Sequence, residues 1–334
     1  MSFEYSIFSG SENGDIVVKK TERPFRPNDV IIKITHTGLC YTDVHQRKRD
    51  MALGHEGVGI VERIGPDVQT IEVGDRVGFS VVRDTCRRCK ECLAGEDMYC
   101  VKPDIYSHPT GSTNLGSLAS HAVISETFVF CIPEAIDNLY AGPLMCAGAT
   151  VFEPLYRYGV RAGERVGIVG VGGLGHLAIQ FANKMGCEVV VFSSTDSKRD
   201  EACELGAHEF HTTKGKEKLE GVKPIKYLLV TTSSQPDWGL FVPIMDTRST
   251  IFPLTVSEEA FDISSFHIIT KGMRIQGSDV APRSVYHALL DFAAAQGIKP
   301  MVKQFPLTKD GIEKAFAAIE DGSLRYRAVL VAQD

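Results

Sequence analysis

The chain has 334 residues, of which 43% are hydrophobic, and its formal net charge is −6 at pH 7. This length exceeds that of a usual single domain and predicts two domains. A mildly acidic chain with scattered Lys and Arg lacks the basic surface that nucleic acid or an anionic membrane requires, so we expect neither partner. No basic leader precedes an apolar run, and no apolar stretch approaches the roughly 20 residues of a membrane-spanning helix. We therefore expect a cytoplasmic protein.

The first part of the chain, up to about residue 133, has the pattern of a mainly β domain. Apolar and β-branched runs bounded by Gly, Pro and Asn predict short strands. A turn or loop is expected over 23–28, between the first two runs. The predicted strands cover residues 15–19, 29–34, 59–65, 76–80 and 121–124.

From about residue 145 the predicted strands alternate with helices. Such alternation predicts a parallel sheet that helices cover on both faces. Strands are expected at 165–170, 188–193, 227–231, 250–254, 273–277 and 328–331, and helices at 174–185, 197–205, 285–296 and 310–319.

Four of the nine cysteines form a C-x2-C-x2-C-x7-C pattern. In a reducing compartment clustered cysteines are more typical of metal ligands than of disulfides. Short, regular spacing lets one loop place its sulfurs around a tetrahedral zinc ion at about 2.3 Å, and a closed site of this kind is structural. An iron–sulfur cluster and free surface thiols are the alternatives. The ligands would be Cys86, Cys89, Cys92 and Cys100, whereas Cys131, Cys187 and Cys203 read as buried small hydrophobic residues.

A second group of metal-ligating residue types is centred on Gly54-His55-Glu56. Cys40 lies shortly before it, and Cys146 is the candidate for a third ligand. A catalytic zinc typically has three protein ligands and one open position, and two thiolates with one imidazole suit a Lewis acid that polarises a carbonyl group. On spacing alone a lone cysteine such as Cys146 is more often a small hydrophobic residue than a ligand.

The segment 170–175 is a G-x-G-x-x-G motif that follows a predicted strand and opens a predicted helix. That context predicts a dinucleotide-binding loop rather than a merely structural glycine turn. Glycines permit the tight turn, the approach of backbone N–H groups to a pyrophosphate, and close packing of helix on strand. The loop comprises Gly170, Gly172, Gly173, Leu174 and Gly175.

The end of the next predicted strand indicates which dinucleotide is preferred. An NAD site usually has a carboxylate there for the ribose 2′-hydroxyl. Here Ser193 and Ser194 occupy that place, and Lys198 follows, so small donors and a cation favour the 2′-phosphate of NADP(H). Asp196 is the contrary residue, and we interpret it, with Ser197, as the N-cap of the next helix.

The sequence resembles the zinc-containing medium-chain dehydrogenase/reductase superfamily and, within it, the cinnamyl alcohol dehydrogenase-like group of NADP-dependent alcohol dehydrogenases. The resemblance covers essentially the whole chain. It rests on Gly54-His55-Glu56 with Gly59, Gly65 and Val68, on Gly74-Asp75-Arg76-Val77, on the four-cysteine lobe, on Cys146-Ala147-Gly148 with Thr150 to Leu155, on Ser193-Ser194 with Lys198, and on Arg325-Tyr326-Arg327.

The resemblance implies an α/β fold with two domains. Residues 1–147 and 281–334 would form a mainly β, GroES-like catalytic domain that carries the structural zinc lobe at about 84–102. Residues 148–280 would form a Rossmann domain with a doubly wound parallel sheet that binds NADP(H). The active site would lie in the cleft between the domains. Relatives with this lobe are commonly homodimers or homotetramers.

The resemblance also implies roles for the site residues. Cys40, His55 and Cys146 would hold a catalytic zinc, and Glu56 would bind it transiently. Thr42 would hydrogen-bond the zinc-bound oxygen and pass a proton by way of the cofactor ribose to His45. Asp43 would orient His55, as carboxylates commonly do for metal-bound histidines. The residues expected to contact the cofactor, besides those already named, are Thr150, Thr232 and Ser278.

These roles predict a zinc-dependent hydride transfer between NADP(H) and an aldehyde or ketone and its alcohol, with two zinc ions per chain and an aromatic or bulky aldehyde as substrate. One alternative is an NADPH-dependent reductase of a C=C or C=N bond. The other is a non-catalytic NADPH-binding protein. Both predict gaps in the ligand or proton-relay set, whereas the sequence retains every member.

The chain departs from the family between His45 and Gly54. Only residues 46–53 lie there, fewer than the family usually has, and Arg47, Lys48 and Arg49 are among them. That loop borders the substrate pocket in the family. We therefore expect the short loop to influence substrate choice.

Overall fold

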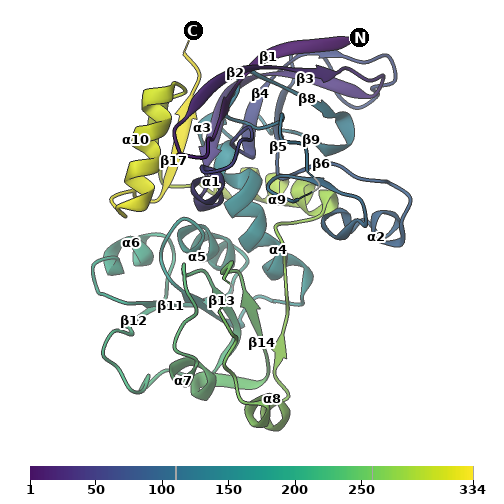
Figure 1. The fold of residues 1–334 in the computed structure, drawn as a ribbon. Coiled ribbons are helices and arrows are strands. Elements are labelled where there is room, and N and C mark those ends of the chain that lie inside the picture. Colours follow the sequence, from purple (N-terminus) through teal and green to yellow (C-terminus); the bar gives the residue numbers. More distant parts are fainter. Residues whose placement is uncertain (110, 258, 334) are drawn as a thin grey trace. The chain divides into compact units, whose positions relative to one another are not determined.

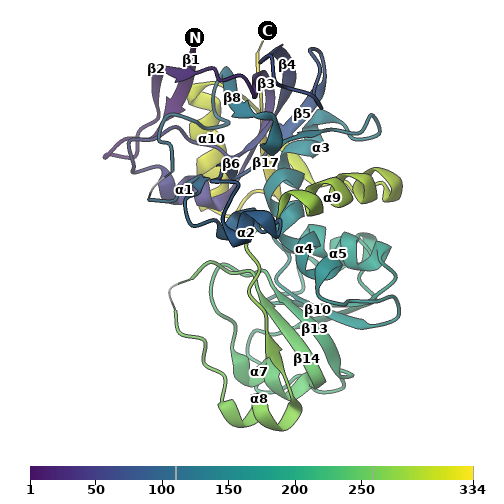
Figure 2. The same cartoon turned by 90° about the vertical axis from the view of Figure 1, so that its right-hand side faces the viewer.

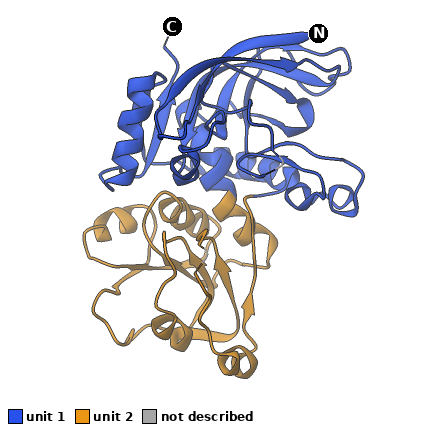
Figure 3. Ribbon diagram, viewed as in Figure 1, with its two compact units in different colours: residues 1–149, 281–334 blue, residues 150–280 orange. Residues whose placement is uncertain are grey.

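The computed structural model describes residues 1–109, 111–257 and 259–333 (Figures 1 and 2). The chain forms two compact units (Figure 3). Unit 1 comprises Met1–Ala149 and Ala281–Asp334, and unit 2 comprises Thr150–Val280. Unit 1 is therefore discontinuous in sequence.

Unit 1 is built on a seven-stranded sheet of the order β16-β17-β3-β4-β5-β9, in which β8 also pairs with β3, among the described residues. All pairs are antiparallel except β16 with β17. The C-terminal strand β17 thus lies beside β3, the third strand of the chain (Figure 1). The strands are β3 (Asp29–Leu39), β4 (Glu56–Ile64), β5 (Arg76–Phe79), β8 (His121–Ser125), β9 (Val129–Cys131), β16 (Val302–Pro306) and β17 (Arg327–Val331).

Strand β3 is the centre of this sheet because it pairs with three neighbours. Val30, Ile31 and Ile32 are fully buried, which explains why the sequence shows a continuous apolar run there rather than alternation. Gly59 of β4 lies against the β3 backbone, where an added Cβ would come within 2.1 Å of the Lys33 carbonyl oxygen. Glycine at this position therefore lets the two central strands approach each other.

Smaller elements complete unit 1. The strands β1 (Ser2–Ser9) and β2 (Val17–Pro24) form an antiparallel hairpin, and β6 (Val82–Asp84) pairs with β7 (Asp104–Ile105). The helices are α1 (Tyr41–Gln46), α2 (Lys90–Leu93), α3 (Asn138–Pro143), α9 (Arg283–Gln296) and α10 (Lys309–Glu320).

Unit 2 contains a parallel six-stranded sheet of the order β12-β11-β10-β13-β14-β15 in the part of the chain that is described. The order reverses between β10 and β13, and ligands of such sheets bind where the carboxyl ends of the strands meet a reversal of this kind. Its strands are β10 (Arg165–Val169), β11 (Glu188–Ser193), β12 (Glu209–Thr212), β13 (Ile225–Val230), β14 (Met245–Pro253) and β15 (Arg274–Ile275). Its helices are α4 (Ala149–Arg157), which begins at the last residue of unit 1, α5 (Gly175–Lys184), α6 (Arg199–Glu204), α7 (Trp238–Phe241) and α8 (Ser265–Lys271).

One buried cluster holds unit 2 together. Val169, Phe192 and Trp238 pack in it with residues from β13 and β14. Phe192 meets Phe241 edge to face, with ring centroids 5.3 Å apart. Burial of aromatic side chains of this size contributes about 2–3 kcal/mol each, so this cluster accounts for the apolar strand patterns seen in the sequence.

Most elements predicted from the sequence are confirmed, and the errors have local causes. The loop expected over 23–28 is wrong at its start, since β2 continues to Pro24. Proline is tolerated there because β2 pairs only with β1, so its outer edge needs no N–H donor. The strand expected over 273–277 shrinks to Arg274–Ile275. Two cysteines expected to be buried, Cys131 and Cys203, are exposed.

The described helices are all too short or too polar to cross a membrane.

Candidate functional site

Two groups of metal-ligating side chains lie in unit 1. Within each group the ligand atoms are all within 4.8 Å of one another. The first group is Cys40, His55, Glu56 and Cys146, and the second is Cys86, Cys89, Cys92 and Cys100.

The sheet and a distorted helix bring the first group together. Gly38 of β3 pairs with Glu56 of β4, so Cys40 and His55 come from neighbouring strand ends. Cys146 lies on a π-helical turn, Leu144–Gly148. Such turns are rare and frequently occur at functional sites, because they re-aim side chains that a regular helix would direct elsewhere. Spacing alone could not predict this convergence.

Hydrogen bonds orient the imidazole of His55. Its Nδ1 lies 3.1 Å from Oδ1 of Asp43, and its Nε2 lies 3.3 Å from Sγ of Cys146. His55 and Asp43 are both buried. Since the carboxylate accepts from Nδ1–H, Nε2 is the ring nitrogen that faces the cysteine sulfurs. The geometry places Asp43 where the predicted orienting residue would lie.

Tyr106 also belongs to this site, although no sequence motif marks it. Its hydroxyl donates to Oδ1 of Asp43 over 2.7 Å, and its ring stacks on the His55 ring with centroids 4.7 Å apart. Burial raises the pKa of Tyr106 well above its usual range, so the hydroxyl remains a donor. A single tyrosine far along the chain carries no local signal, and only the folded register shows its position.

Glu56 forms a buried ion pair with Arg327 of β17. The two side chains are buried, and Oε2 of Glu56 has no hydrogen-bond partner among the described residues. That oxygen faces Gly38, where an added Cβ would lie 1.9 Å from it. Burial raises the pKa of Glu56, although the nearby guanidinium of Arg327 opposes the shift. The sequence pointed to the segment 325–327 only as a strand and gave no sign of this ion pair.

The protonation of the first group suits a metal ion. The hydrogen bond from Cys146 lowers the pKa of Cys40 well below its ordinary value, although burial opposes this effect. The same interaction raises the pKa of Cys146 well above its ordinary value. Burial lowers the pKa of His55, but the Asp43 carboxylate outweighs it and raises that pKa to about 10. A cation that replaces the shared protons would relieve this crowding of acidic groups.

The donor set fits zinc. Two thiols and one imidazole are ligands that a tetrahedral zinc ion takes, and bonds of about 2.3 Å imply ligand atoms roughly 3–4 Å apart. The distance of 3.3 Å between His55 and Cys146 agrees with that spacing. Three protein ligands leave a fourth position, and a carboxylate oxygen of Glu56 lies within 4.8 Å of the other ligand atoms.

The four-cysteine lobe fits a second zinc ion. The Sγ atoms of Cys86 and Cys92 are 3.9 Å apart, and those of Cys89 and Cys92 are 3.5 Å apart. Backbone N–H groups of Cys86 and Lys102 donate to Sγ of Cys100 over 3.4 and 3.3 Å. Such bonds stabilise thiolates, and those from Cys92 and Val101 lower the pKa of Cys89 to about 6. Four thiols with no open position are typical of a structural site.

Thr42 and His45 lie on α1, directly after Cys40. Oγ1 of Thr42 is 3.7 Å from Sγ of Cys40, so its hydroxyl is next to the proposed ligand. His45 is exposed and packs edge to face on Tyr41, with ring centroids 4.9 Å apart. Residues three apart share one helix face, so the structure places a hydroxyl beside the candidate ligand Cys40 and an imidazole at the solvent on that face.

In unit 2 the glycine loop lies at the point where the strand order reverses. Gly170 has φ +95°, and Oγ1 of Thr231, after β13, donates to its carbonyl oxygen over 3.0 Å. An added Cβ on Gly175 would meet the Gly170 oxygen at 2.0 Å, whereas the space beside Gly172 is open. Nδ1 of His176 lies 2.9 Å from the Gly172 oxygen. The loop therefore has the shape that a pyrophosphate requires at the start of α5.

The residues predicted to select NADP(H) cluster beside this loop. Ser193 ends β11, Ser194 follows it exposed to solvent, and Nζ of Lys198 donates to the Val171 oxygen over 2.5 Å. The interpretation of Asp196 as an N-cap is wrong, because α6 begins at Arg199 with no side-chain cap. Asp196 instead pairs with Arg199 over 2.6 Å, since that guanidinium offers a stronger charge-assisted bond than a backbone N–H.

The remaining predicted cofactor residues lie at two places, beside the glycine loop and at α4. Thr232 adjoins Gly170, since its Cγ2 would be 3.0 Å from an added Cβ there. Ser278 donates to Glu153, a buried residue of α4. Thr150 is half-buried at the start of α4. The structure thus brings Thr232 to the glycine loop and pairs Ser278 with a carboxylate.

The short segment 46–53 is packed against the N-terminal hairpin. Ala52 bridges Ser9, and the Leu53 N–H donates to the Phe8 oxygen over 3.0 Å. The guanidinium of Arg47 donates to the Gly14 carbonyl oxygen and lies over the ring of Phe316 at 5.3 Å. The segment is therefore anchored to other parts of unit 1.

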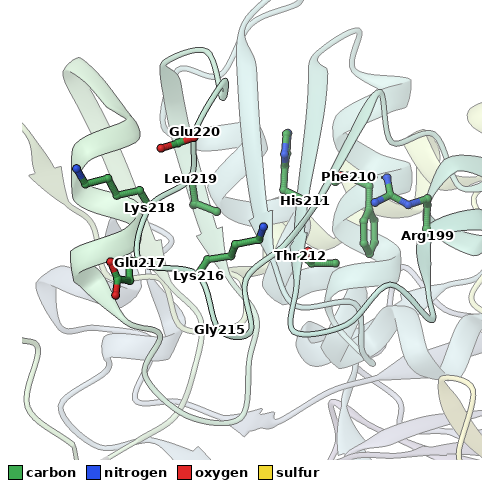
Figure 4. Close-up of a pocket in the computed structure, with 10 residues that line it drawn as sticks. All are labelled: Arg199, Phe210, His211, Thr212, Gly215, Lys216, Glu217, Lys218, Leu219 and Glu220. Carbon is green, nitrogen blue, oxygen red and sulfur yellow. Dashed lines mark hydrogen bonds between the residues drawn. The ribbon is translucent and has the colours of Figure 1, made fainter.

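A pocket of about 600 Å³ lies at the β12 edge of unit 2 (Figure 4). The guanidinium of Arg199 lies over the ring of Phe210 at 4.7 Å. Two lysines and two glutamates line the pocket, so their charges balance and favour neither anionic nor cationic ligands. The lining residues are Arg199, Phe210, His211, Thr212, Gly215, Lys216, Glu217, Lys218, Leu219 and Glu220.

Two family models match the chain. The alcohol dehydrogenase GroES-like domain matches residues 26–134, and the zinc-binding dehydrogenase model matches residues 173–295. The chain is 34% identical, over 320 residues, to the probable formaldehyde dehydrogenase AdhA of Bacillus subtilis, covering 92% of this chain and 91% of that protein.

Solved structures agree with these matches. The cinnamyl alcohol dehydrogenase SbCAD4 from Sorghum bicolor superposes with a TM-score of 0.92 at 29% identity, over 98% of both chains. The cinnamyl alcohol dehydrogenase of Helicobacter pylori, solved in complex with NADP(H), superposes with a TM-score of 0.88 at 25% identity, over 99% of both chains.

We predict that Arg327→Met destabilises unit 1 by roughly 3–5 kcal/mol, because it leaves the buried Glu56 carboxylate unpaired. Chemical denaturation of the purified protein measures this loss. The double variant Arg327→Met/Glu56→Gln should recover much of it, since the buried charge is then removed as well. Lys314→Met, which breaks the exposed pair with Asp310, is the control and should cost about 0–1 kcal/mol. Equal losses in the two single variants would contradict the prediction.

Proposed function

Because the chain belongs to the family of zinc-binding alcohol dehydrogenases, we propose that it transfers a hydride between NADP(H) and an aldehyde or ketone and the corresponding alcohol. The membership confirms the family predicted from the sequence motifs and the fold class, a GroES-like domain with a Rossmann domain. The observation that supports the proposal most strongly is the convergence of Cys40, His55 and Cys146 on one point, with Asp43 behind the imidazole.

We assign the residues of the two groups as zinc ligands. Cys40, His55 and Cys146 would hold a catalytic ion, and the four cysteines of the lobe would hold a structural one. Zinc and NADPH supply a Lewis acid and a hydride when they are bound. Arg327 holds Glu56 by an ion pair, and Oε2 of Glu56 has no hydrogen-bond partner within the described part of the chain.

The side chains of α1 handle the proton. The Thr42 hydroxyl can donate a hydrogen bond to the oxygen of the substrate, because it lies beside Cys40. His45 is one turn further on the same helix and open to solvent, so it can exchange the proton with water. Positioned proton transfer of this type typically contributes a factor of 10²–10⁴ to the rate.

The unit with the glycine loop would bind NADP(H). Ser193, Ser194 and Lys198 offer two hydroxyls and one cation to the 2′-phosphate, and no carboxylate replaces them at the end of β11. The Helicobacter pylori relative was solved with NADP(H), which supports the same choice here. We name Gly170, Gly172, Gly173, Leu174, Gly175, Thr150, Thr232 and Ser278 as the further cofactor residues.

We propose aromatic or bulky aldehydes as substrates, since SbCAD4 is a cinnamyl alcohol dehydrogenase. The complete set of Thr42, His45 and the zinc ligands favours carbonyl chemistry over reduction of a C=C or C=N bond.

The cytoplasm is the compartment we propose, because it keeps thiol ligands reduced.

A homodimer is the assembly that we propose, with a homotetramer built from it as the larger alternative. Strand β15 ends the sheet of unit 2, and the helix α8 beside it has no buried residue. Phe266, Ile269 and Ile275 are 65%, 77% and 42% exposed. Exposed apolar side chains on a helix, near an edge strand that has one neighbour among the described residues, suit pairing with a second copy about a two-fold axis.

The zinc assignment and the activity are tested together on the purified enzyme. Two zinc ions per chain are expected, with oxidation of NADPH by aromatic aldehydes, aliphatic aldehydes or bulky ketones. Cys146→Ser should remove one ion and lower kcat/KM at least about a hundredfold, because a lost ligand removes Lewis-acid stabilisation of several kcal/mol. Cys131→Ser, at an exposed cysteine, is the control. A Cys146→Ser enzyme with two ions and full activity would sink the proposal.

Ser193→Asp tests the nucleotide preference. A carboxylate at the end of β11 repels a 2′-phosphate and can bond a free ribose hydroxyl, so kcat/KM should fall for NADPH and rise for NADH. We expect a change of at least about tenfold in the ratio, or 1.4 kcal/mol. Ser323→Asp adds the same charge to an exposed site in unit 1 and should leave the ratio unchanged. An unaltered ratio in Ser193→Asp would show that the pocket is elsewhere.

Ile269→Glu tests the assembly. A charge on the exposed face of α8 should convert the dimer, or the tetramer, to a smaller species, because a buried unpaired carboxylate opposes association. Light scattering or sedimentation measures the mass. Val73→Glu, at a residue 61% exposed in unit 1, is the matched control. A wild-type chain that is monomeric at micromolar concentration contradicts the assembly.

A further inference from the structure

We propose that Tyr106 is a positioning residue for the zinc ligand His55, and that the stack of Arg83, Tyr106 and His55 is the device that sets the plane of the imidazole. The proposal rests on the proposed function, because His55 is assigned there as a zinc ligand. Tyr106 would act on the metal only through His55 and Asp43.

Tyr106 contacts His55 and two of its neighbours in the site, Asp43 and Gly54. Its ring stacks on the imidazole with centroids 4.7 Å apart and planes 28° apart. Its hydroxyl donates to Oδ1 of Asp43 over 2.7 Å, the shortest bond that this carboxylate accepts. The same hydroxyl accepts from the N–H of Gly54, the residue before His55, over 3.1 Å. One side chain therefore constrains the ring, its hydrogen-bond partner and its backbone.

Arg83 constrains the Tyr106 ring as well. The guanidinium of Arg83 lies over it at 5.0 Å and donates to the Ser112 oxygen over 2.8 Å. Arg83 is 2% exposed, as is Tyr106. A cation–π contact out of water contributes about 2 kcal/mol, so the tyrosine ring has little freedom to tilt. Because the His55 imidazole packs on the tyrosine ring, its tilt is limited as well.

Zinc binding depends on such restraint. A ligand held in one orientation loses less entropy when the ion binds, and the partners that orient a metal-bound histidine typically contribute a factor of 10–100 to metal affinity. The hydrogen bonds that Asp43 accepts from other groups hold its carboxylate in place, so that it remains a fixed acceptor for Nδ1–H of His55. Removing the Tyr106 hydroxyl takes away the shortest of them, while the ring and most of the packing remain.

The test compares Tyr106→Phe with Tyr5→Phe. Tyr5 is another buried tyrosine of unit 1, and its hydroxyl donates to the Asn114 oxygen over 3.1 Å, so the control makes the same chemical change. Zinc release from the holoenzyme to a competing chelator is followed for both ions. The ion that Cys146→Ser loses is the one that His55 would hold. Tyr106→Phe should weaken that ion about tenfold and leave the four-cysteine ion unchanged, and Tyr5→Phe should weaken neither.

Each outcome is decisive. Selective weakening of the Cys146-dependent ion, with kcat lowered and KM for NADPH unchanged, supports the proposal. Equal loosening of both ions, including loss through unfolding, means a general structural role and overturns the proposal, as does wild-type affinity in Tyr106→Phe. If wild-type protein has no Cys146-dependent ion, the proposed function itself fails.

Discussion

The buried carboxylate of Asp43 is the constraint on which the site depends. A carboxylate without exposure to water must be surrounded by donors, since an unsatisfied buried charge costs several kcal/mol. Asp43 accepts from the backbone of Cys40 and Gly54, from His55 and from Tyr106. These four donors belong to three segments of the chain, so satisfying one charge fixes two proposed metal ligands, Cys40 and His55, relative to each other. The fold of unit 1 can be understood as the means of bringing those segments together.

The buried carboxylate of Glu56 explains why the C-terminal part of the chain belongs to unit 1. Glu56 follows His55 and is buried, so it also requires a partner. Arg327 supplies one from β17, which pairs with β3 beside Gly38 and Leu39. The C-terminal segment therefore both completes the sheet and neutralises a carboxylate next to the proposed ligands. A unit lacking residues 281–334 would have neither the strand nor the cation, which gives the discontinuity of the unit a physical reason.

The sequence alone predicted those features that are determined by residues close together in the chain. The four-cysteine spacing, the glycine loop between β10 and α5, and the alternation of strands and helices in unit 2 are local patterns, and the structure contains each of them. Local rules failed at Asp196, where an ion pair with Arg199 replaced the expected cap. Tyr106 and Arg327 could not be predicted, because their contacts depend on the register of strands far apart in sequence. The π-helical turn that aims Cys146 has no motif of its own.

The short segment before Gly54 takes on a different meaning in the folded chain. Ala52 and Leu53 are fully buried and bound to the N-terminal hairpin, and the Leu118 N–H donates to the Leu53 oxygen over 2.9 Å. Gly54 itself has φ +90° and no room for a Cβ, which would meet Oγ of Ser117 at 2.4 Å. The backbone of residues 52–54 is therefore held by its neighbours, and Gly54 has a left-handed conformation. Together these constraints fix the direction in which the backbone passes through His55 into β4. The contacts of Ala52 and Leu53 thus help to fix the position of His55, and the influence of the segment on substrate choice stays a prediction.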